Sequence, residues 1–214
     1  MKVTLYYAPI ACSLVSLISL NESGSDFEVK PVNMRKQEQM SPEYLKMNPK
    51  HKVPTLVIDG QPITENVAMA LWMTRAFPKA GILPADSDTE IKAISIMAWC
   101  ASGIHPHLSR INSPLKFCDT PGSEEGTKRM SAKELDHVFE IANDMLAGRE
   151  YFFDRWCAAD SHFMWCWRRA IQFGLDFSKY KNCVAHYERM QKRPAVAKAL
   201  EFETQTQAEL AKAA

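Results

Sequence analysis

A cysteine at the start of a predicted helix is the residue best placed to do chemistry. Residues 2–7 predict a β-strand, because they are β-branched and aromatic and contain no breaker. After a short turn, the apolar spacing of Leu14, Leu17 and Ile18 predicts a helix whose first turn contains Cys12. The unpaired N–H groups and the positive dipole end of a helix favour an anion at that place. We therefore expect the Cys12 thiol to tend toward the nucleophilic thiolate, or the turn to bind the sulfur of a ligand.

Two hydroxyl groups are predicted beside this thiol. Ser13 follows Cys12 and is either a donor to the thiolate or a simple helix cap. Tyr7 ends the predicted strand at the same turn, although tyrosine is also ordinary in strands. The sequence leaves both alternatives open for each residue.

Two further segments could complete a binding site. A proline directly before a strand, as in Val53-Pro54, is typical of a cis peptide bond, which would leave the Val53 N–H and C=O free to pair with a peptide. Glu65-Asn66 starts another predicted helix, where N–H groups and an amide could hold a carboxylate and the glutamate could hold an ammonium. With the thiol-binding turn, these features predict a receptor for a small peptide thiol.

The elements that must position these residues follow the order β-α-β-α-β-β-α, which is typical of a thioredoxin-like α/β module. Further strands are predicted at 27–32, 55–58 and 61–63. Helices are predicted between the first three strands and after the last, and the Asp59-Gly60 hairpin turn joins 55–58 to 61–63. We expect this domain to span 1–77 and a Pro- and Gly-rich linker to span 78–88. Residues 89–214 show only helical patterns and predict an all-α domain.

Composition excludes several classes of protein. The 214 residues carry a formal net charge of +1, which does not favour nucleic acid or a membrane surface as a partner. No apolar run approaches the length of a membrane span. The six cysteines have no paired metal-type spacing, so we expect no metal ion, and reduced thiols fit a cytoplasmic protein without a targeting signal.

These motifs together resemble the cytosolic glutathione transferases, and the bacterial beta class most closely. The resemblance covers nearly the whole chain and rests on the order and spacing of short segments: Tyr7, 11–14, 48–50, Val53-Pro54, 64–66, 104–106, 159–160 and 190–194. It implies a homodimer that uses glutathione as co-substrate. It also implies glutathione conjugation to electrophiles, or glutathione-dependent thiol exchange.

The resemblance also implies roles for single residues. It matches Cys12 to the cysteine that beta-class enzymes place beside the glutathione sulfur, and Lys36 and Lys52 to ligands of the glycine carboxylate. It places His105 over that cysteine, where a neutral imidazole could take the proton of a thiol. A histidine in a helix is otherwise more often a surface or core residue.

Two positions depart from the family pattern. Asn66 stands where the family usually has the serine that binds the γ-glutamyl carboxylate. Cys157 stands where a serine or threonine commonly caps the helix that contains Asp160, so the bond from Asp160 to the backbone would have to hold that turn.

The sequence thus predicts a transferase that conjugates glutathione to hydrophobic electrophiles bound by the helical domain. Thiol-disulfide exchange through Cys12 is a second predicted activity, with glutathione as the resolving thiol because no neighbouring cysteine follows in the helix. The alternative is a non-catalytic protein that keeps this fold for binding or assembly.

Overall fold

The computed structural model describes residues 1–212, which form two compact units. The first unit contains Met1–Ala85 together with residues 192–212, and the second contains Asp86–Gln191. None of the helices among the described residues is both long and apolar enough to cross a membrane.

The first unit is built on a four-stranded sheet. Its strands are β1 (Val3–Tyr7), β2 (Glu28–Pro31), β3 (Thr55–Ile58) and β4 (Gln61–Thr64), in the spatial order β2-β1-β3-β4. β1 pairs in parallel with β2 and antiparallel with β3, and β3 pairs antiparallel with β4. The connection between β1 and β2 contains the helix α1, which is the usual way to join two parallel strands.

Three helices complete the predicted order β-α-β-α-β-β-α, which is confirmed. They are α1 (Ser13–Ser23), α2 (Pro42–Met47) and α3 (Asn66–Ala76), with a short 3₁₀ turn, η1 (Glu38–Met40), before α2. α2 begins after Ser41, whose hydroxyl caps the helix by accepting the Tyr44 N–H at 3.2 Å. α1 ends at Gly24, whose φ of 64° is the left-handed conformation that glycine adopts easily.

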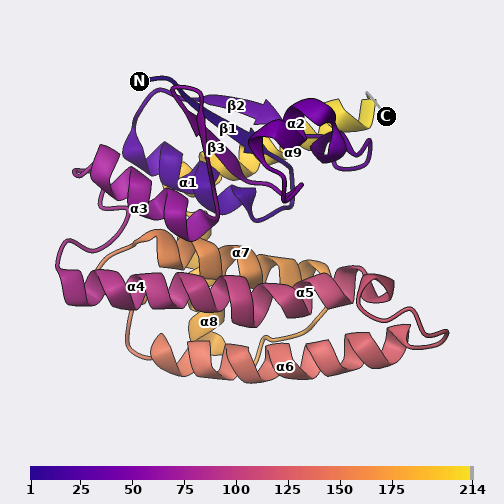
Figure 1. Ribbon diagram of the computed structural model, residues 1–214. Coiled ribbons are helices and arrows are strands. Elements are labelled where there is room, and N and C mark those ends of the chain that lie inside the picture. Colours follow the sequence, from indigo (N-terminus) through magenta and orange to yellow (C-terminus); the bar gives the residue numbers. More distant parts are fainter. Residues whose placement is uncertain (213–214) are drawn as a thin grey trace. The chain divides into compact units, whose positions relative to one another are not determined.

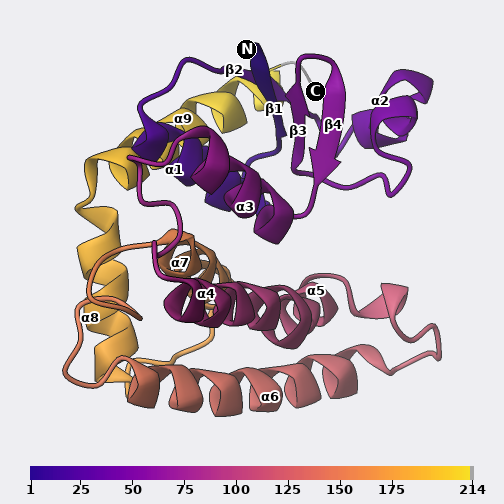
Figure 2. The ribbon, with the colours of Figure 1, turned by 60° about the vertical axis from the view of Figure 1, so that its left-hand side comes forward.

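The two faces of the sheet are covered by different helices. Leu5 and Tyr7 of β1 are fully buried. The helices α1 and α3 lie together on one face of the sheet and pack against each other (Figures 1 and 2). Because side chains alternate along a strand, Tyr6 points to the opposite face. There its ring meets the ring of Tyr44 in α2 edge-on, with centroids 5.8 Å apart.

The C-terminal helix, α9 (Pro194–Lys212), belongs to the first unit, whereas the sequence predicts it with the all-α domain. It packs along α1, as the yellow helix beside α1 in Figure 2 shows. The Asn21 side chain donates to the Ala195 carbonyl at 3.1 Å, and Arg193 pairs with Glu22 at 2.8 Å. These contacts join segments more than 170 positions apart, which local sequence patterns do not predict.

The regular secondary structure of the second unit is entirely helical, as predicted. It contains α4 (Ser87–Trp99), η2 (Cys100–Ile104), α5 (His105–Asn112), η3 (Pro114–Lys116), α6 (Glu124–Met145), α7 (Ala158–Gln172) and α8 (Lys181–Gln191). Its core includes aromatic side chains of α6 and α7, among them Phe139, Phe163, Trp165 and Trp167, which are all buried.

A π-helical turn, η2, separates α4 from α5. The His105 N–H bonds to the carbonyl of Cys100, five residues earlier. Pro106 lacks an N–H, and its ring would clash with the carbonyl four residues back, so a wider turn relieves the conflict. Gly103 in this turn lies against Trp99, where an added Cβ would come within 2.6 Å of the indole ring.

Candidate active site

The Cys12 thiol lies at the N-terminal end of α1 and faces the cis-proline loop. Cys12 is the residue before α1, and it is partly buried. Its Sγ donates a hydrogen bond to the Val53 carbonyl at 3.5 Å. The Val53-Pro54 peptide bond is cis, which confirms the prediction from sequence. The thiol and the cis-proline loop, which are 41 residues apart in sequence, therefore lie next to each other in the candidate site.

The pKa of this thiol is shifted opposite to the predicted direction. Burial is the largest cause and, with the negative charge of Glu65, raises the pKa of Cys12 to about 12. The N–H of Cys12, the Asn66 side chain and the charge of Lys52 oppose this rise but do not overcome it. The expectation that Cys12 tends toward the thiolate is therefore wrong. At neutral pH, Cys12 is a thiol that can donate a hydrogen bond.

The Ser13 hydroxyl closes the turn between β1 and α1. It donates to the Ala8 carbonyl at 2.9 Å and accepts the Ala8 N–H at 3.1 Å, and the residue is fully buried. Neither predicted use matches this placement, since Ser13 is the first residue of α1 and Cys12 occupies the capping position. The structure assigns Ser13 to the frame that holds Cys12.

The Tyr7 hydroxyl is engaged with the C-terminal helix. Its side chain lies on the face of the sheet that α9 reaches, and its hydroxyl donates to Glu203 Oε2 at 3.1 Å. The same carboxylate oxygen accepts the N–H of Ile10 at 2.7 Å, in the turn before Cys12. Tyr7 is fully buried, and its bond to Glu203 supports the turn that precedes Cys12.

A buried polar network fixes the loop that carries Val53. The carbonyl of Lys52 accepts hydrogen bonds from the Tyr44 hydroxyl and from the Asn48 amide, both at 2.7 Å. Both side chains also contact the Thr55 hydroxyl, at 3.0 Å. With each of these polar groups paired, the loop is held on both sides of the cis bond, and the Val53 backbone is presented next to Cys12.

Glu65 and Asn66 occupy the N-terminal end of α3, as predicted. Glu65 precedes the helix with a φ of 74°, a conformation that a residue with a side chain rarely adopts and that is found most often at functional sites. Its carboxylate pairs with the Lys50 ammonium, which also donates to the Thr64 hydroxyl at 2.8 Å. The pair is largely exposed, so solvent and salt weaken it and a second cation can compete for the carboxylate.

The Asn66 amide is engaged inside the fold, although the sequence suggests it as a carboxylate ligand. Its Nδ2 donates to the Cys12 carbonyl at 3.1 Å, and its Oδ1 accepts the Ser16 hydroxyl at 2.7 Å. The first N–H groups of α3 have no acceptor within their own helix. An anion at this helix end would therefore meet backbone donors, with the Asn66 amide turned toward α1.

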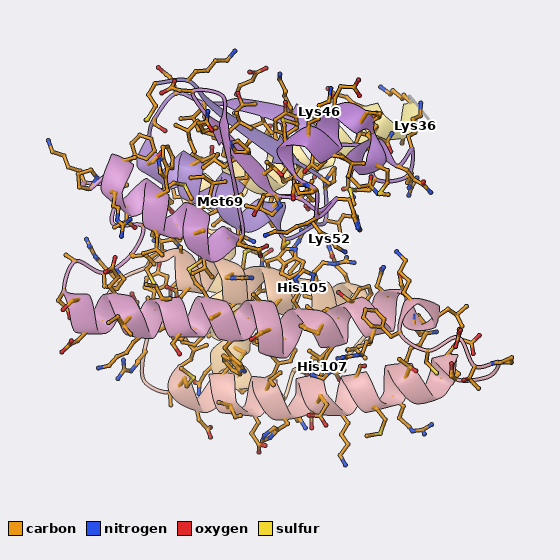
Figure 3. The ribbon with its side chains drawn as sticks, in the orientation of Figure 1. Lys36, Lys46, Lys52, Met69, His105 and His107 are labelled. Atoms are coloured by element: carbon orange, nitrogen blue, oxygen red, sulfur yellow. The ribbon has the colours of Figure 1, made fainter. Side chains whose placement is uncertain are left out.

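The two predicted lysines lie in the loops before and after α2. Figure 3 labels Lys36 in the loop after β2, and Lys52 in the loop before β3. The Lys36 N–H donates to Asn33 Oδ1 at 3.2 Å, which fixes the backbone of its turn. The positive charge of Lys52 lowers the pKa of Cys12, although burial outweighs this effect.

His105 begins α5 in the second unit, directly after the π-helical turn. Its ring meets the ring of Trp165 edge-on, with centroids 4.6 Å apart. Burial and the charge of His105 lower the pKa of the neighbouring His162 to about 3, so His162 is neutral at physiological pH. The proposed proton transfer between His105 and Cys12 stays a prediction, because the two residues belong to separate units.

We expect Cys118 to react with iodoacetamide faster than Cys12 at pH 8. Hydrogen bonds from Ser123 and Thr120 lower the pKa of Cys118, which is partly exposed, whereas the pKa of Cys12 is about 12. Below that value, the alkylation rate of Cys12 should rise about tenfold per pH unit, because the thiolate fraction does. Mass spectrometry of cysteine peptides over time checks both rates. A Cys12 rate that levels off below pH 8 would contradict the account.

Fold and site together define a protein with a thioredoxin-like unit, a thiol beside its cis-proline loop and a helical second unit. Residues 1–72 match the family model "Glutathione S-transferase, N-terminal domain". Over 205 residues the chain is 32% identical to "Glutathione S-transferase GstA" of Escherichia coli O157:H7, which covers 93% of this chain and 98% of that relative. The chain therefore belongs to the glutathione S-transferase family, as its motifs suggest.

Solved structures agree with this assignment. The glutathione S-transferase from Xylella fastidiosa has a TM-score of 0.89 and 25% identity, covering 95% of this chain and 99% of that one. The bacterial beta-class enzyme of Sphingomonas chungbukensis has a TM-score of 0.82 and 28% identity, covering 94% and 98%. A sphingomonad glutathione S-transferase complexed with glutathione has a TM-score of 0.83 and 27% identity, again covering 94% and 98%.

Proposed function

We propose that the protein is a glutathione transferase that conjugates glutathione to hydrophobic electrophiles. The observation that carries the proposal is the placement of the Cys12 thiol on the Val53 carbonyl, in a unit whose α3 begins with Glu65 and Asn66. The resemblance to a sphingomonad enzyme complexed with glutathione supports glutathione as the ligand.

Each part of glutathione has a chemically suitable partner in the first unit. The Glu65 carboxylate takes the γ-glutamyl ammonium by competing with Lys50, and the first N–H groups of α3 take the γ-glutamyl carboxylate. The Val53 backbone, turned by Pro54, pairs with the cysteinyl part as a neighbouring strand would. Lys36 and Lys52 supply positive charge for the glycine carboxylate.

In this proposal, Cys12 activates the glutathione thiol by hydrogen bonding. A free thiol has a pKa near ~8.5, and lowering it by two units takes about 2.7 kcal/mol of preferential stabilisation of the anion. A hydrogen bond to a charged group contributes about 1.5–3 kcal/mol. Cys12, protonated at neutral pH, can supply such a bond by turning from the Val53 carbonyl to the ligand sulfur. The sulfur of glutathione then attacks the electrophilic carbon, and the halide or other leaving group departs with its electron pair.

We propose His105 as a group that takes up the proton of the glutathione thiol, with the helical unit supplying the apolar surface for the electrophile. The π-helical turn that precedes His105 supports this assignment, since such turns are frequent at functional sites. The raised pKa of Cys12 weighs against thiol-disulfide exchange initiated by this residue, because little attacking thiolate is present. Since all six cysteines are free, we propose a cytoplasmic location.

Turnover with an aromatic halide tests this proposal. We expect wild-type protein to conjugate glutathione and the Cys12→Ala variant to retain roughly a tenth of the rate, the loss that one charge-assisted hydrogen bond represents. Cys12→Ser, which keeps a donor at this place, should lie between the two. A protein that binds to a glutathione column and elutes with free glutathione, but conjugates no electrophile, would instead favour the non-catalytic alternative.

We also propose that the active unit is a homodimer, from the resemblance to the family. One chain has a mass of 24.3 kDa, so light scattering at working concentration should report about twice this value. A mass of one chain at the concentration of the activity assay would contradict the dimer and leave the assignment of the ligand-binding residues unaffected.

A further inference from the structure

The amide of Asn66 bridges the N-terminal ends of α1 and α3. Asn66 is buried, with 8% of its surface exposed, and both ends of its amide are used. Nδ2 donates to the Cys12 carbonyl, and Oδ1 accepts the hydroxyl of Ser16, one turn further along α1. The Ser16 hydroxyl also lies 3.1 Å from the sulfur of Met69, which Figure 3 labels on α3.

These contacts fix the peptide group that carries the reactive thiol. The Cys12 carbonyl also accepts the N–H of Val15 at 3.1 Å, so its plane is set from within α1 and from α3. Ser16 holds the oxygen end of the amide, and this orients the Nδ2 group toward Cys12. We call the Asn66 amide, with its bonds to the Cys12 carbonyl and the Ser16 hydroxyl, the brace. Because both of its ends are engaged, it keeps the Cys12 residue next to the Val53 carbonyl.

We infer that Asn66 is a positioning residue for Cys12 and does not bind the ligand carboxylate through its side chain. The carboxylate half of this inference rests on the proposed glutathione site, and the positioning half does not. Under this arrangement the backbone N–H groups at the start of α3 bind the carboxylate alone. In this arrangement the Asn66 side chain makes no contact with the ligand carboxylate and instead fixes the position of the Cys12 thiol.

Removing the brace should make Cys12 more reactive. Burial is the largest cause of its raised pKa, and the opposing hydrogen bond of Asn66 is a smaller one. We expect Asn66→Ala to open space between α1 and α3, so that water reaches the thiol and the relief of burial outweighs the lost hydrogen bond. We expect Cys12 to be alkylated by iodoacetamide at least about fivefold faster at pH 8, which corresponds to a pKa lower by about 0.7.

Two serines of α1 supply a matched comparison. Ser16→Ala frees the oxygen end of the Asn66 amide and should accelerate Cys12 alkylation about two- to threefold. Ser19 is equally buried on the same helix, but its hydroxyl bonds to the carbonyl of Val15, so Ser19→Ala should leave the rate unchanged. If Asn66→Ala does not fold, as judged by circular dichroism, the two serine variants decide the question.

Calorimetry with reduced glutathione completes the experiment. We expect Asn66→Ala to bind glutathione less than tenfold more weakly than wild type while its Cys12 alkylation accelerates. A loss of affinity of tenfold or more would overturn the inference, because the side chain would then be a ligand. An alkylation rate equal to wild type in Asn66→Ala, or in Ser16→Ala where that variant decides, would overturn the positioning role. If wild type binds no glutathione, the proposed function fails, and the alkylation rates still test the brace.

Discussion

Glu65→Ala should weaken glutathione binding about a hundredfold while the fold is unchanged. The substitution removes the carboxylate proposed to hold the γ-glutamyl ammonium, and hydrogen bonds to charged groups contribute about 1.5–3 kcal/mol each. It also leaves the Lys50 ammonium without this partner, so an uncompensated positive charge faces the ligand ammonium. Alanine at this position meets the same backbone demand as glutamate, because both carry a Cβ at a φ of 74°. Calorimetric titration with glutathione measures the change.

Two variants serve as controls for this experiment. Glu43→Ala removes an exposed acid from α2 and should bind glutathione as wild type does, which excludes a general effect of charge. Lys50→Ala should bind glutathione at least as tightly as wild type, because it removes the cation that competes for Glu65. Undiminished affinity in Glu65→Ala would show that the ammonium is bound elsewhere, and it would remove the main support for the proposed pocket.

Asp160→Ala should lower the free energy of unfolding by about 3–5 kcal/mol. Asp160 is fully buried at the start of α7, and its carboxylate accepts the N–H groups of Cys157 and Phe152 at 2.9 and 3.0 Å. The His186 ring of α8 lies 3.0 Å from the same carboxylate. Alanine would leave these buried polar groups without their acceptor, which costs far more than the loss of an exposed bond.

Urea unfolding followed by circular dichroism measures this effect. Asp154→Ala truncates an exposed aspartate before the same helix, so it should change the free energy of unfolding by less than about 0.5 kcal/mol. The Asp160 carboxylate accepts the Cys157 N–H, as predicted, but it does not hold the turn alone, because the Cys157 side chain also accepts the backbone N–H of Asp160 and completes a capping box. A loss below about 1 kcal/mol in Asp160→Ala would contradict that view of the turn.

Local patterns are sufficient to predict the elements of the first unit. The β-branched run of β1, the proline at the start of α2 and the proline before β3 each restrict the backbone by their own chemistry, so the sequence predicts them without knowledge of packing. The cis bond at Pro54 is predicted for the same reason. The break at Cys100–Ile104 is harder to predict, because a proline signals a disturbed helix but does not specify a π-helical turn.

Long-range contacts explain where the prediction of the site fails. The partner of the Tyr7 hydroxyl, Glu203, lies 196 positions away on α9, and no local signal connects the two. The pKa of Cys12 was predicted from its place at a helix end, but burial by the surrounding loops outweighs that favourable field. The role of Asn66 depends on α1 and α3 lying side by side, which is a property of the folded unit.

The ionisation of bound glutathione tests the central claim most directly. The ultraviolet absorbance of a thiolate, recorded as a difference spectrum across pH, reports this ionisation in wild type and in Cys12→Ala. We expect the pKa of bound glutathione to be lowered by about two units in wild type, and by about one unit less in Cys12→Ala, where the donor is missing. A bound thiol that titrates at the pKa of free glutathione, or equally in both proteins, would contradict the proposal that Cys12 activates glutathione by hydrogen bonding.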